Sequence, residues 1–265
     1  MTPNPKQQIS TTYSAAADHY ELPALGFWNH FGGRTVQRAG LASGAMVLDV
    51  CCGAGGSAVP AARVVGPTGR VIGVDLAPAL VHLARAKAAA QGIANVEFRH
   101  ADFDQVYFRP ASFDAVVCVF GVFFFPDMPA ALQKMWRFLR PGGQLAITTW
   151  GADAFDPLST VFWEAVRRER PELYKGFSAW SRLAKPGAVE SLFAEAGIEA
   201  VEVTREDYEQ PMESAEAWWT ILMGSGYRAT VDRLTPPERD RVREACLALS
   251  APTVRLPVTY AIARR

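Results

Sequence analysis

Residues 45–76 read AMVLDVCCGAGGSAVPAARVVGPTGRVIGVDL. The first six form a short apolar run that breaks into the turn CCGAGGS, and residues 58–65 then predict a helix. The turn GPTG at 66–69 leads into a second apolar run, RVIGVDL, which predicts another buried strand. A strand, a glycine turn, a helix and a strand in this order predict a βαβ unit with two parallel strands.

The same alternation continues through the middle of the chain. A helix is expected over APALVHLARAKAAAQG at 77–92, and another over DMPAALQKMWRFLRPGG at 127–143. Apolar runs that predict further strands lie at 95–102, 113–121 and 144–150. Runs that are nearly continuous in apolar residues indicate strands covered on both faces. The sequence therefore predicts an α/β fold with a doubly wound, mostly parallel, Rossmann-like sheet.

The regular alternation of strands and helices stops after Trp150, where an aromatic stretch interrupted by proline begins. A strand is expected near 198–206, and the alternating run TVRLPVTYAIARR predicts a last strand that joins the sheet when the chain returns. We expect four segments on this basis. They are an N-terminal cap segment at 1–40, a cofactor-binding core at 41–212, a helical cap insertion at 213–250, and a final antiparallel strand at 251–265.

Composition bears on the partners and the compartment. The 265 residues contain 27 Lys plus Arg and 27 Asp plus Glu, and no basic run is visible, so we expect no nucleic-acid partner. The spacing of the four cysteines fits neither a zinc site nor a disulfide framework, so we expect no metal. No apolar stretch approaches the roughly 18 residues of a membrane span, and the sequence predicts a cytoplasmic protein.

The glycine turn after the first strand indicates a nucleotide-like ligand. In doubly wound sheets this turn faces the crevice where ligands bind, and Gly53 and Gly55 let backbone amides approach a ligand closely. The helix N-terminus behind the turn adds partial positive charge. Asp75 ends the second strand about 20 residues further on, where a carboxylate accepts hydrogen bonds from ribose hydroxyls. The alternative for Asp75 is an N-cap of the following helix.

The glycine turn alone leaves the cofactor open, because Gly53-x-Gly55-x-x-Ala58 also satisfies the dinucleotide fingerprint. Asp49 favours S-adenosylmethionine, since a carboxylate there repels a pyrophosphate but attracts an ammonium and a sulfonium. Alternatively, Asp49 caps the amides of its own loop. Three functions remain: a methyltransferase, an NAD(P)-dependent oxidoreductase, and a non-catalytic S-adenosylmethionine-binding partner of another protein.

Five motifs together resemble the class I S-adenosylmethionine-dependent methyltransferases, especially the small-molecule branch of ubiquinone and menaquinone biosynthesis. The similar segments are VLDVCCGAGG, RVIGVDLAPALVHLAR, HADFDQVYF, FDAVVCVFGVFFFPD and LQKMWRFLRPGGQLAITTW. The resemblance implies a seven-stranded sheet with its last strand antiparallel, S-adenosylmethionine as cofactor and S-adenosylhomocysteine as product. It does not specify the methyl acceptor.

The resemblance also implies roles for particular residues. At the methionine part it places Asp49 and the loop residues Cys51, Cys52, Gly53, Ala54 and Gly55, with Arg34 near the carboxylate. The alternative for Arg34 is a position on a solvated helix face. At the ribose it places Asp75 and Leu76, and around the adenine Ala101, Asp102 and Phe103, with Asp102 accepting from the exocyclic amine. Phe120 then lines the methyl-donor region.

Methyl transfer from a sulfonium is an in-line displacement that alignment and desolvation accelerate without acid or base catalysis. The segment 122–125, VFFF, offers no general base, so we expect an apolar pocket for a small, apolar or aromatic molecule. The residues expected to bind it are Trp28, Phe123, Trp218, Trp219 and Tyr227, beside Phe120. Packing of the cap on the core is the alternative for each. His19 is a weak candidate for a catalytic base.

Overall fold

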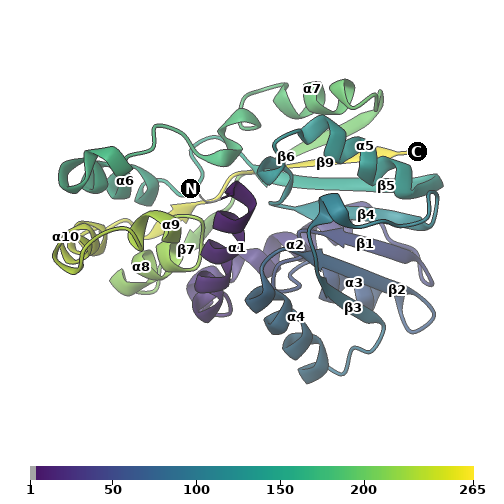
Figure 1. Ribbon diagram of the computed structural model, residues 1–265, viewed down its shortest axis with the longest axis horizontal. Helices are drawn as coiled ribbons and strands as arrows, with labels where there is room; N and C mark the ends of the chain where they lie inside the picture. The colour runs from purple at the N-terminus through teal and green to yellow at the C-terminus, as the bar shows by residue number, and fades with distance from the viewer. Residues whose placement is uncertain (1–3) are drawn as a thin grey trace.

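The structure is a computed structural model that describes residues 4–265. A seven-stranded sheet with the order β3-β2-β1-β4-β5-β9-β6 forms its centre (Figure 1). The strands of this sheet are β1 Met46–Val50, β2 Arg70–Asp75, β3 Val96–His100, β4 Phe113–Val119, β5 Leu139–Trp150, β6 Val201–Glu206 and β9 Val258–Arg264. The first five strands are parallel, and β9 runs antiparallel to both β5 and β6. The predicted fold class is confirmed.

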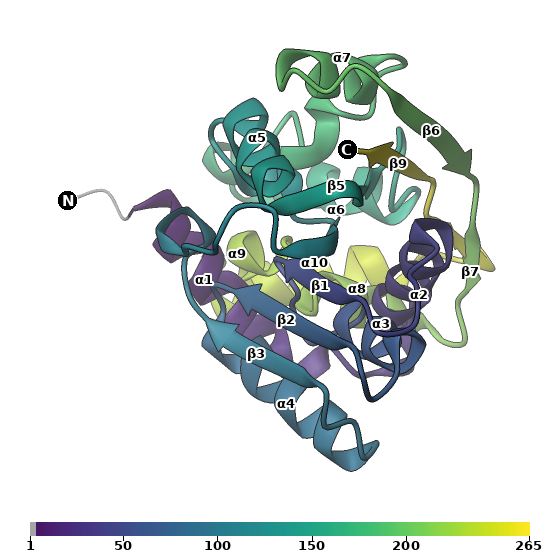
Figure 2. The same ribbon diagram turned by 90° about the vertical axis from the view of Figure 1, so that its right-hand side faces the viewer.

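Helices cover both faces of the sheet, as Figure 2 shows for α3 and α4 on one side and α5 and α7 on the other. The helices are α1 Pro5–Ala16, α2 Phe27–Ala39, α3 Ala58–Val65, α4 Pro78–Ala90, α5 Met128–Phe138, α6 Leu158–Glu169, α7 Ala188–Glu195, α8 Ala215–Met223, α9 Arg228–Val231 and α10 Pro236–Leu247. Successive side chains of β1 enter different cores: Val47 packs with α3 and α4, and Leu48 packs on the opposite face. This burial on both sides explains why the strands are nearly continuous apolar runs.

The order of the strands creates a crevice at the carboxyl end of β1. The chain leaves β1 toward β2 and β3, then returns to place β4 on the other side of β1. The loops after β1 and β4 therefore leave the sheet in opposite directions, and a ligand site forms between them. This is the edge of the sheet over which α1 lies in Figure 1.

The first forty residues divide between two surroundings. Helix α1 lies against α4 and α9, and the short 3-10 helix η2 (Pro23–Leu25) contacts α8. Helix α2 instead packs on β4 and β5, beside α3. The part before α2 therefore lies next to the helices of 213–250, whereas α2 belongs mainly to the layer that covers the sheet.

The C-terminal run differs from the single strand that the sequence predicts. Its first part, β8 Thr253–Arg255, pairs with β7 Glu209–Pro211 in a separate two-stranded sheet. Only β9 joins the main sheet. The break falls at Pro257, which has no N–H to donate to a ladder.

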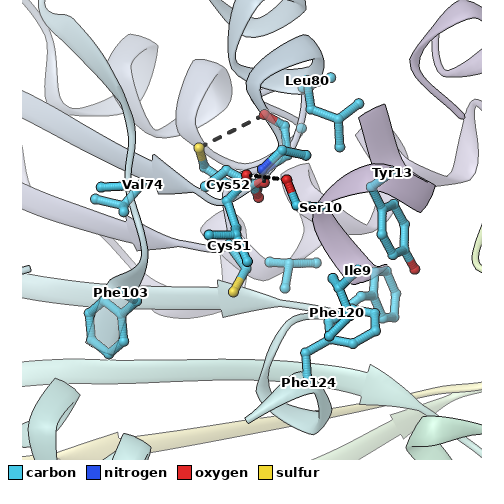
Figure 3. A pocket seen from close by; sticks show the side chains of 18 of the residues that line it. Ile9, Ser10, Tyr13, Cys51, Cys52, Val74, Leu80, Phe103, Phe120 and Phe124 are labelled. Carbon is cyan, nitrogen blue, oxygen red and sulfur yellow. Dashed lines mark hydrogen bonds between the residues drawn. The ribbon is translucent and has the colours of Figure 1, made fainter. Parts of the chain in front are cut away.

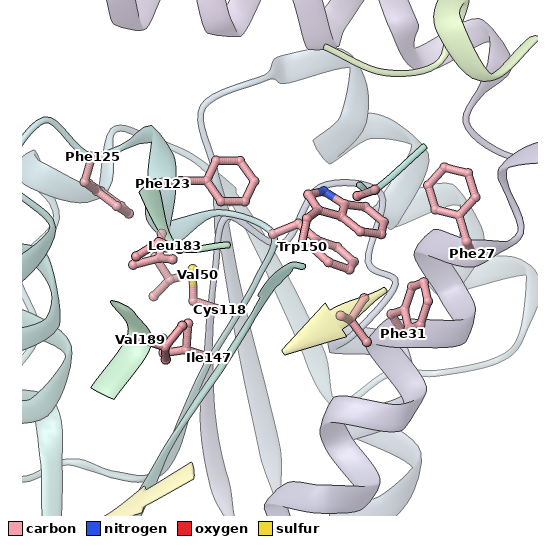
Figure 4. Packing of buried hydrophobic residues seen from close by; sticks show 14 of the residues in the cluster. Phe27, Phe31, Val50, Cys118, Phe123, Phe125, Ile147, Trp150, Leu183 and Val189 are labelled. Carbon is pink, nitrogen blue, oxygen red and sulfur yellow. The ribbon is translucent and has the colours of Figure 1, made fainter. Parts of the chain in front are cut away.

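Aromatic side chains fill the space between α2 and the carboxyl ends of β4 and β5 (Figure 4). The ring of Trp150, at the end of β5, packs edge-on against Phe27 at 5.9 Å and Phe31 at 5.8 Å. It also stacks on Phe120 with ring centroids 3.8 Å apart. These contacts join α2 firmly to the edge of the sheet where the crevice lies.

Candidate functional site

A cavity opens at the carboxyl ends of β1, β2 and β4, with α1 across it (Figure 3). The charged side chains that line it are Lys6, Asp75 and Asp102, and we call their side of the cavity the polar end. Asp75 lies where this side meets the aromatic residues, since burial and, in addition, the charge of Asp75 raise the pKa of Tyr13 and Tyr20. The other end is lined by five aromatic side chains, Tyr13, Tyr20, Trp28, Phe120 and Phe124, and we call it the aromatic end. The glycine turn after β1 lies between the two.

The turn after β1 is shaped by its backbone conformation and by Asp75. Cys51 has φ +58° and Gly53 has φ +51°, so the chain turns sharply as it leaves the strand. The N–H of Gly53 donates to Oδ2 of Asp75 at 2.8 Å, and the N–H of Ala77 donates to Oδ1 at 2.8 Å. Burial raises the pKa of Asp75, and these two backbone hydrogen bonds oppose the rise. Asp75 thus holds the turn and the start of α4, and still lines the cavity.

The polar end is closed by an ion-pair cluster from two distant segments. Nζ of Lys6, on α1, lies 2.9 Å and 2.7 Å from the two carboxylate oxygens of Asp102 and also bonds Asp104. Ser10, one turn further along α1, donates to the carbonyl of Leu76 at 2.8 Å. Helix α1 is therefore fastened to the ends of both β2 and β3.

The aromatic end is built from α1, the segment that joins it to α2, α2 itself and the loop after β4. The rings of Tyr20 and Trp28 stack at 5.3 Å with 3° between their planes, and Trp28 meets Phe120 edge-on at 5.7 Å. Tyr13 meets Phe124 edge-on at 5.5 Å. Phe120 has φ +54°, an unfavourable conformation for a bulky residue, which points to a functional constraint at this strand end.

Comparisons with known proteins decide the family. A family model described as a methyltransferase domain matches residues 47–143. The chain is 30% identical over 245 residues to nocamycin O-methyltransferase from Saccharothrix syringae, covering 87% of this chain and 86% of that protein. It is also 30% identical over 192 residues to an aklanonic acid methyltransferase from Streptomyces sp. (strain C5), covering 68% and 87%.

The chain belongs to the class I S-adenosylmethionine-dependent methyltransferases. Solved structures agree on the fold. The YcgJ protein of Bacillus subtilis matches with a TM-score of 0.59 at 18% identity, over 89% of this chain and 98% of that one. A phosphoethanolamine N-methyltransferase of Haemonchus contortus matches with a TM-score of 0.61 at 19% identity, over 99% and 60%. The oxidoreductase and the non-catalytic alternatives receive no support.

This methyltransferase brings most of the predicted cofactor residues to one cavity. The predicted residues that line it are Cys51, Cys52, Gly53, Ala54, Asp75, Leu76, Ala101, Asp102, Phe103 and Phe120, together with Trp28 from the predicted substrate set. Their individual roles toward the cofactor remain predictions. Gly55 lies within the same turn but does not line the cavity. A side chain at this position would meet Phe98 and Val59 beneath the turn.

Asp49 lies behind the glycine turn of the methyltransferase, not on the cavity surface. Its side chain is 1% exposed, and Oδ2 accepts from the Ser57 hydroxyl at 2.6 Å. Its other oxygen, Oδ1, is buried without a partner in the described chain. Burial raises the pKa of Asp49 to about 7, and the hydrogen bond from Ser57 opposes that rise. The observed partner of Asp49 is thus the Ser57 hydroxyl and not an amide of the loop, and the predicted attraction to a cofactor ammonium remains a prediction.

Arg34 requires a correction, because the structure does not bring it to the cavity. Its guanidinium lies 3.0 Å from Oε2 of Glu206, on β6, which also accepts from Arg38 at 2.9 Å and from Tyr260 at 3.2 Å. The face of α2 that carries Arg34 and Arg38 points toward β6 and β9. Arg34 is thus part of an ion-pair cluster that joins α2 to β6 and β9.

Three predicted substrate residues from the 213–250 insertion also lie outside the cavity lining, which is a second correction. Trp218 is 1% exposed within the core, and Trp219 packs against that core. Tyr227 meets Phe162 at 5.2 Å. Tyr227 joins the start of α9 to α6, and both tryptophans belong to or pack on the same hydrophobic cluster, so the packing alternative describes these residues.

Two further predictions change in detail. Phe123 is 4% exposed and packs against Trp180 at 6.1 Å, whereas its neighbours Phe124 and Phe125 line the cavity. The 3-10 helix η4 (Val122–Phe124) turns successive side chains to different sides. His19, the weak base candidate, packs beside Gly224 and does not line the cavity.

Sequence reasoning missed the contribution of α1. Lys6, Ile9, Ser10 and Tyr13 all line the cavity. Their spacing of three and four residues is the period of one helix face, and this signal is present in the sequence. It does not by itself say that the face covers a ligand site. Within residues 4–265 no group of three potential metal ligands is found, and no helix is long and apolar enough to cross a membrane.

Proposed function

We propose that this methyltransferase transfers a methyl group to a small, flat, mostly apolar molecule held at the aromatic end of the cavity. The observation that carries the proposal is the division of a single cavity into a polar end and an aromatic end. The relatives support a small acceptor, since one is named as a nocamycin O-methyltransferase and another as an aklanonic acid methyltransferase.

The residues at the polar end suit the adenosyl part of the cofactor. Each carboxylate oxygen of Asp75 accepts one backbone N–H and has a second lone pair for a ribose hydroxyl. Oδ2 of Asp102 accepts only from Lys6 among the described residues, so it has room for the exocyclic amine of an adenine. Phe103 and Leu76 supply apolar surface for the ring.

The glycine turn suits the methionine part. The turn from Cys51 to Gly53 presents backbone toward the cavity next to the aromatic end. When bound, S-adenosylmethionine supplies an electrophilic methyl group on a sulfonium. Tyr20 and Trp28 would offer aromatic faces to that positive charge, an attraction of about 0.5–2 kcal/mol. Their stacked arrangement fixes these faces in advance.

All four cysteines, Cys51, Cys52, Cys118 and Cys246, are free thiols. Free thiols persist in reducing compartments, which supports a cytoplasmic location as part of this proposal.

Calorimetry with S-adenosylhomocysteine tests the cofactor assignment. We expect Asp75→Ala to weaken its binding by about 1–3 kcal/mol, because hydrogen bonds to a charged group are lost and Gly53 loses an acceptor. The matched control is Asp240→Asn, an exposed position on α10. Unchanged affinity in Asp75→Ala would remove Asp75 from the site, and tighter binding of NAD(H) than of S-adenosylhomocysteine to the wild type would contradict the proposed function.

A further inference from the structure

We propose that Lys134, which lies on α5 outside the cavity, is a positioning residue for the recognition of adenine. It holds the short 3-10 helix η3 (Phe103–Gln105) so that Asp102 presents a carboxylate oxygen to the exocyclic amine and the site rejects a base that lacks this amine. This inference rests on the proposed function, which places the adenine at Asp102.

The direction of the Asp102 carboxylate depends on the turn that follows β3. Asp102 is the N-cap of η3, and its Oδ1 accepts from the backbone N–H of Asp104 at 3.0 Å. Its backbone carbonyl accepts from the N–H groups of Gln105 at 2.9 Å and Val106 at 3.1 Å. The sheet thus brings Asp102 to the cavity, but η3 sets where its side chain points. A change in this turn would move the carboxylate away from an amine bound in the cavity.

Lys134 holds the backbone of this turn from the side of α5. Its Nζ donates to the carbonyl oxygens of Phe103 at 2.6 Å and Asp104 at 3.0 Å, as lysines near the end of a helix commonly do. The same Nζ lies 4.8 Å from the centre of the Phe103 ring and occupies one face of it. Lys134 therefore fixes both the backbone of η3 and the ring of Phe103, which lines the cavity.

Lys6 and Lys134 both bind this turn, but a ligand affects them differently. Lys6 comes from α1 and bonds the carboxylate of Asp102 itself, at 2.9 Å and 2.7 Å, so it shares that carboxylate with any amine that enters. Within residues 4–265 the hydrogen bonds of the Lys134 ammonium go to backbone carbonyls, and Lys134 does not line the cavity. Lys134 can therefore keep its contacts when the cofactor binds, and it can hold the direction of Asp102 throughout.

The charge of Lys134 alone would have the opposite effect on the amine, which separates the two roles. Burial lowers the pKa of Lys134, and the charges of Asp104 and Asp102 oppose this fall, so the ammonium and these carboxylates feel each other. If Lys134 acted only through its charge, its removal would let Asp102 attract an amine hydrogen more strongly. If Lys134 acts by holding η3, its removal weakens recognition of the amine. The two roles predict changes of opposite sign.

The test compares S-adenosylhomocysteine with S-inosylhomocysteine, which carries a carbonyl oxygen in place of the exocyclic amine. Calorimetry gives both dissociation constants, and their ratio cancels any effect of a variant on the ribose and methionine parts. We expect the wild type to prefer S-adenosylhomocysteine by about tenfold or more, because the carbonyl oxygen of the analogue would face a carboxylate. Lys134→Met should lower this preference to about threefold or less. Lys134→Arg, which can still donate to both carbonyls, should keep at least about half of it.

Arg137→Met is the matched control, since it removes a cation from an exposed position on the same helix and should leave the ratio unchanged. Lys134→Gln gives the same comparison if the methionine variant does not fold. An unchanged or increased preference on removal of the Lys134 ammonium overturns the proposal, as does an equal loss of preference in Arg137→Met. A wild type that binds both compounds equally also overturns it, because Asp102 then recognises no amine. Failure of the wild type to bind either compound would instead contradict the proposed function.

Discussion

The polar end and the aromatic end of the cavity are built from different parts of the chain. Asp75 is the last residue of β2 and Asp102 follows the neighbouring β3, so the parallel sheet alone brings them together. The aromatic residues come from α1, α2 and the loop after β4, and they meet only when helices pack across the strand ends. The placement of the cofactor residues therefore rests on the sheet, whereas the acceptor site rests on helix packing. Variants that disturb one and not the other test this difference.

The largest effect on stability is expected where the helix layer contacts the sheet's loops, between α2 and the glycine turn. A side chain at Gly32 would lie 2.2 Å from the carbonyl oxygen of Gly56 and 2.7 Å from the nitrogen of Ser57. Gly32→Ala should therefore destabilise the fold by about 3 kcal/mol, since backbone atoms must move apart. Weaker binding of S-adenosylhomocysteine should accompany this, because the turn carries that movement to the cavity.

The neighbouring glycine provides the control in the same helix. A side chain at Gly33 would meet nothing within 4 Å, so Gly33→Ala should stabilise the protein by up to about 1 kcal/mol through helix propensity. Urea unfolding of both variants measures the contrast. Equal stabilities would show that α2 is not in close contact with the glycine turn. The polar end and the aromatic end of the cavity would then not be coupled through this contact.

The residues that the sequence predicted well are those whose function depends on local chain order. Asp75 ends a strand and precedes a helix, and the structure places it at the cavity. Lys6 and Ser10 were missed because their partners lie 96 and 66 residues away. Arg34 was misplaced for the same reason, since Glu206 is 172 residues further on. An apolar helix such as AEAWWTILM predicts a buried face but not whether that face meets a cavity or a core.

The next prediction concerns pH and Asp49, beneath the glycine turn. In the unfolded chain its pKa is near 3.8, and burial raises it to about 7 in the folded protein. Between these values the unfolded chain ionises while the folded protein keeps its proton, so stability falls as pH rises. From pH 5 to pH 7 the loss is on the order of 2 kcal/mol, and above the folded pKa it levels off.

Asp49→Asn stays neutral and should lack this loss, while its amide oxygen still accepts from Ser57. The stability of the variant relative to wild type should therefore increase between pH 5 and pH 7, as measured by urea unfolding at each pH. Asp240→Asn, at an exposed position, controls for a change of net charge. Parallel pH curves for Asp49→Asn and wild type would show that this carboxyl is ionised in the folded protein.

The smallest effect is expected at Lys6, where the polar end meets α1. Its ion pairs with Asp102 and Asp104 involve side chains that are 26–41% exposed, and such pairs contribute about 0.2–1 kcal/mol.

Because α1 lies across the cavity, its release from β3 should govern how fast a ligand enters and leaves. Lys6→Met should therefore speed both association and dissociation of S-adenosylhomocysteine by about threefold and leave its dissociation constant nearly unchanged. Stopped-flow tryptophan fluorescence follows both rates, and added salt should speed the wild type toward the variant. Lys6→Arg keeps the charge and should behave as wild type, whereas Asp104→Asn should reproduce part of the effect without touching Asp102. Faster dissociation alone, with unchanged association, would make Lys6 a contact of the bound cofactor, and the packing of α1 would then contribute to cofactor recognition as well.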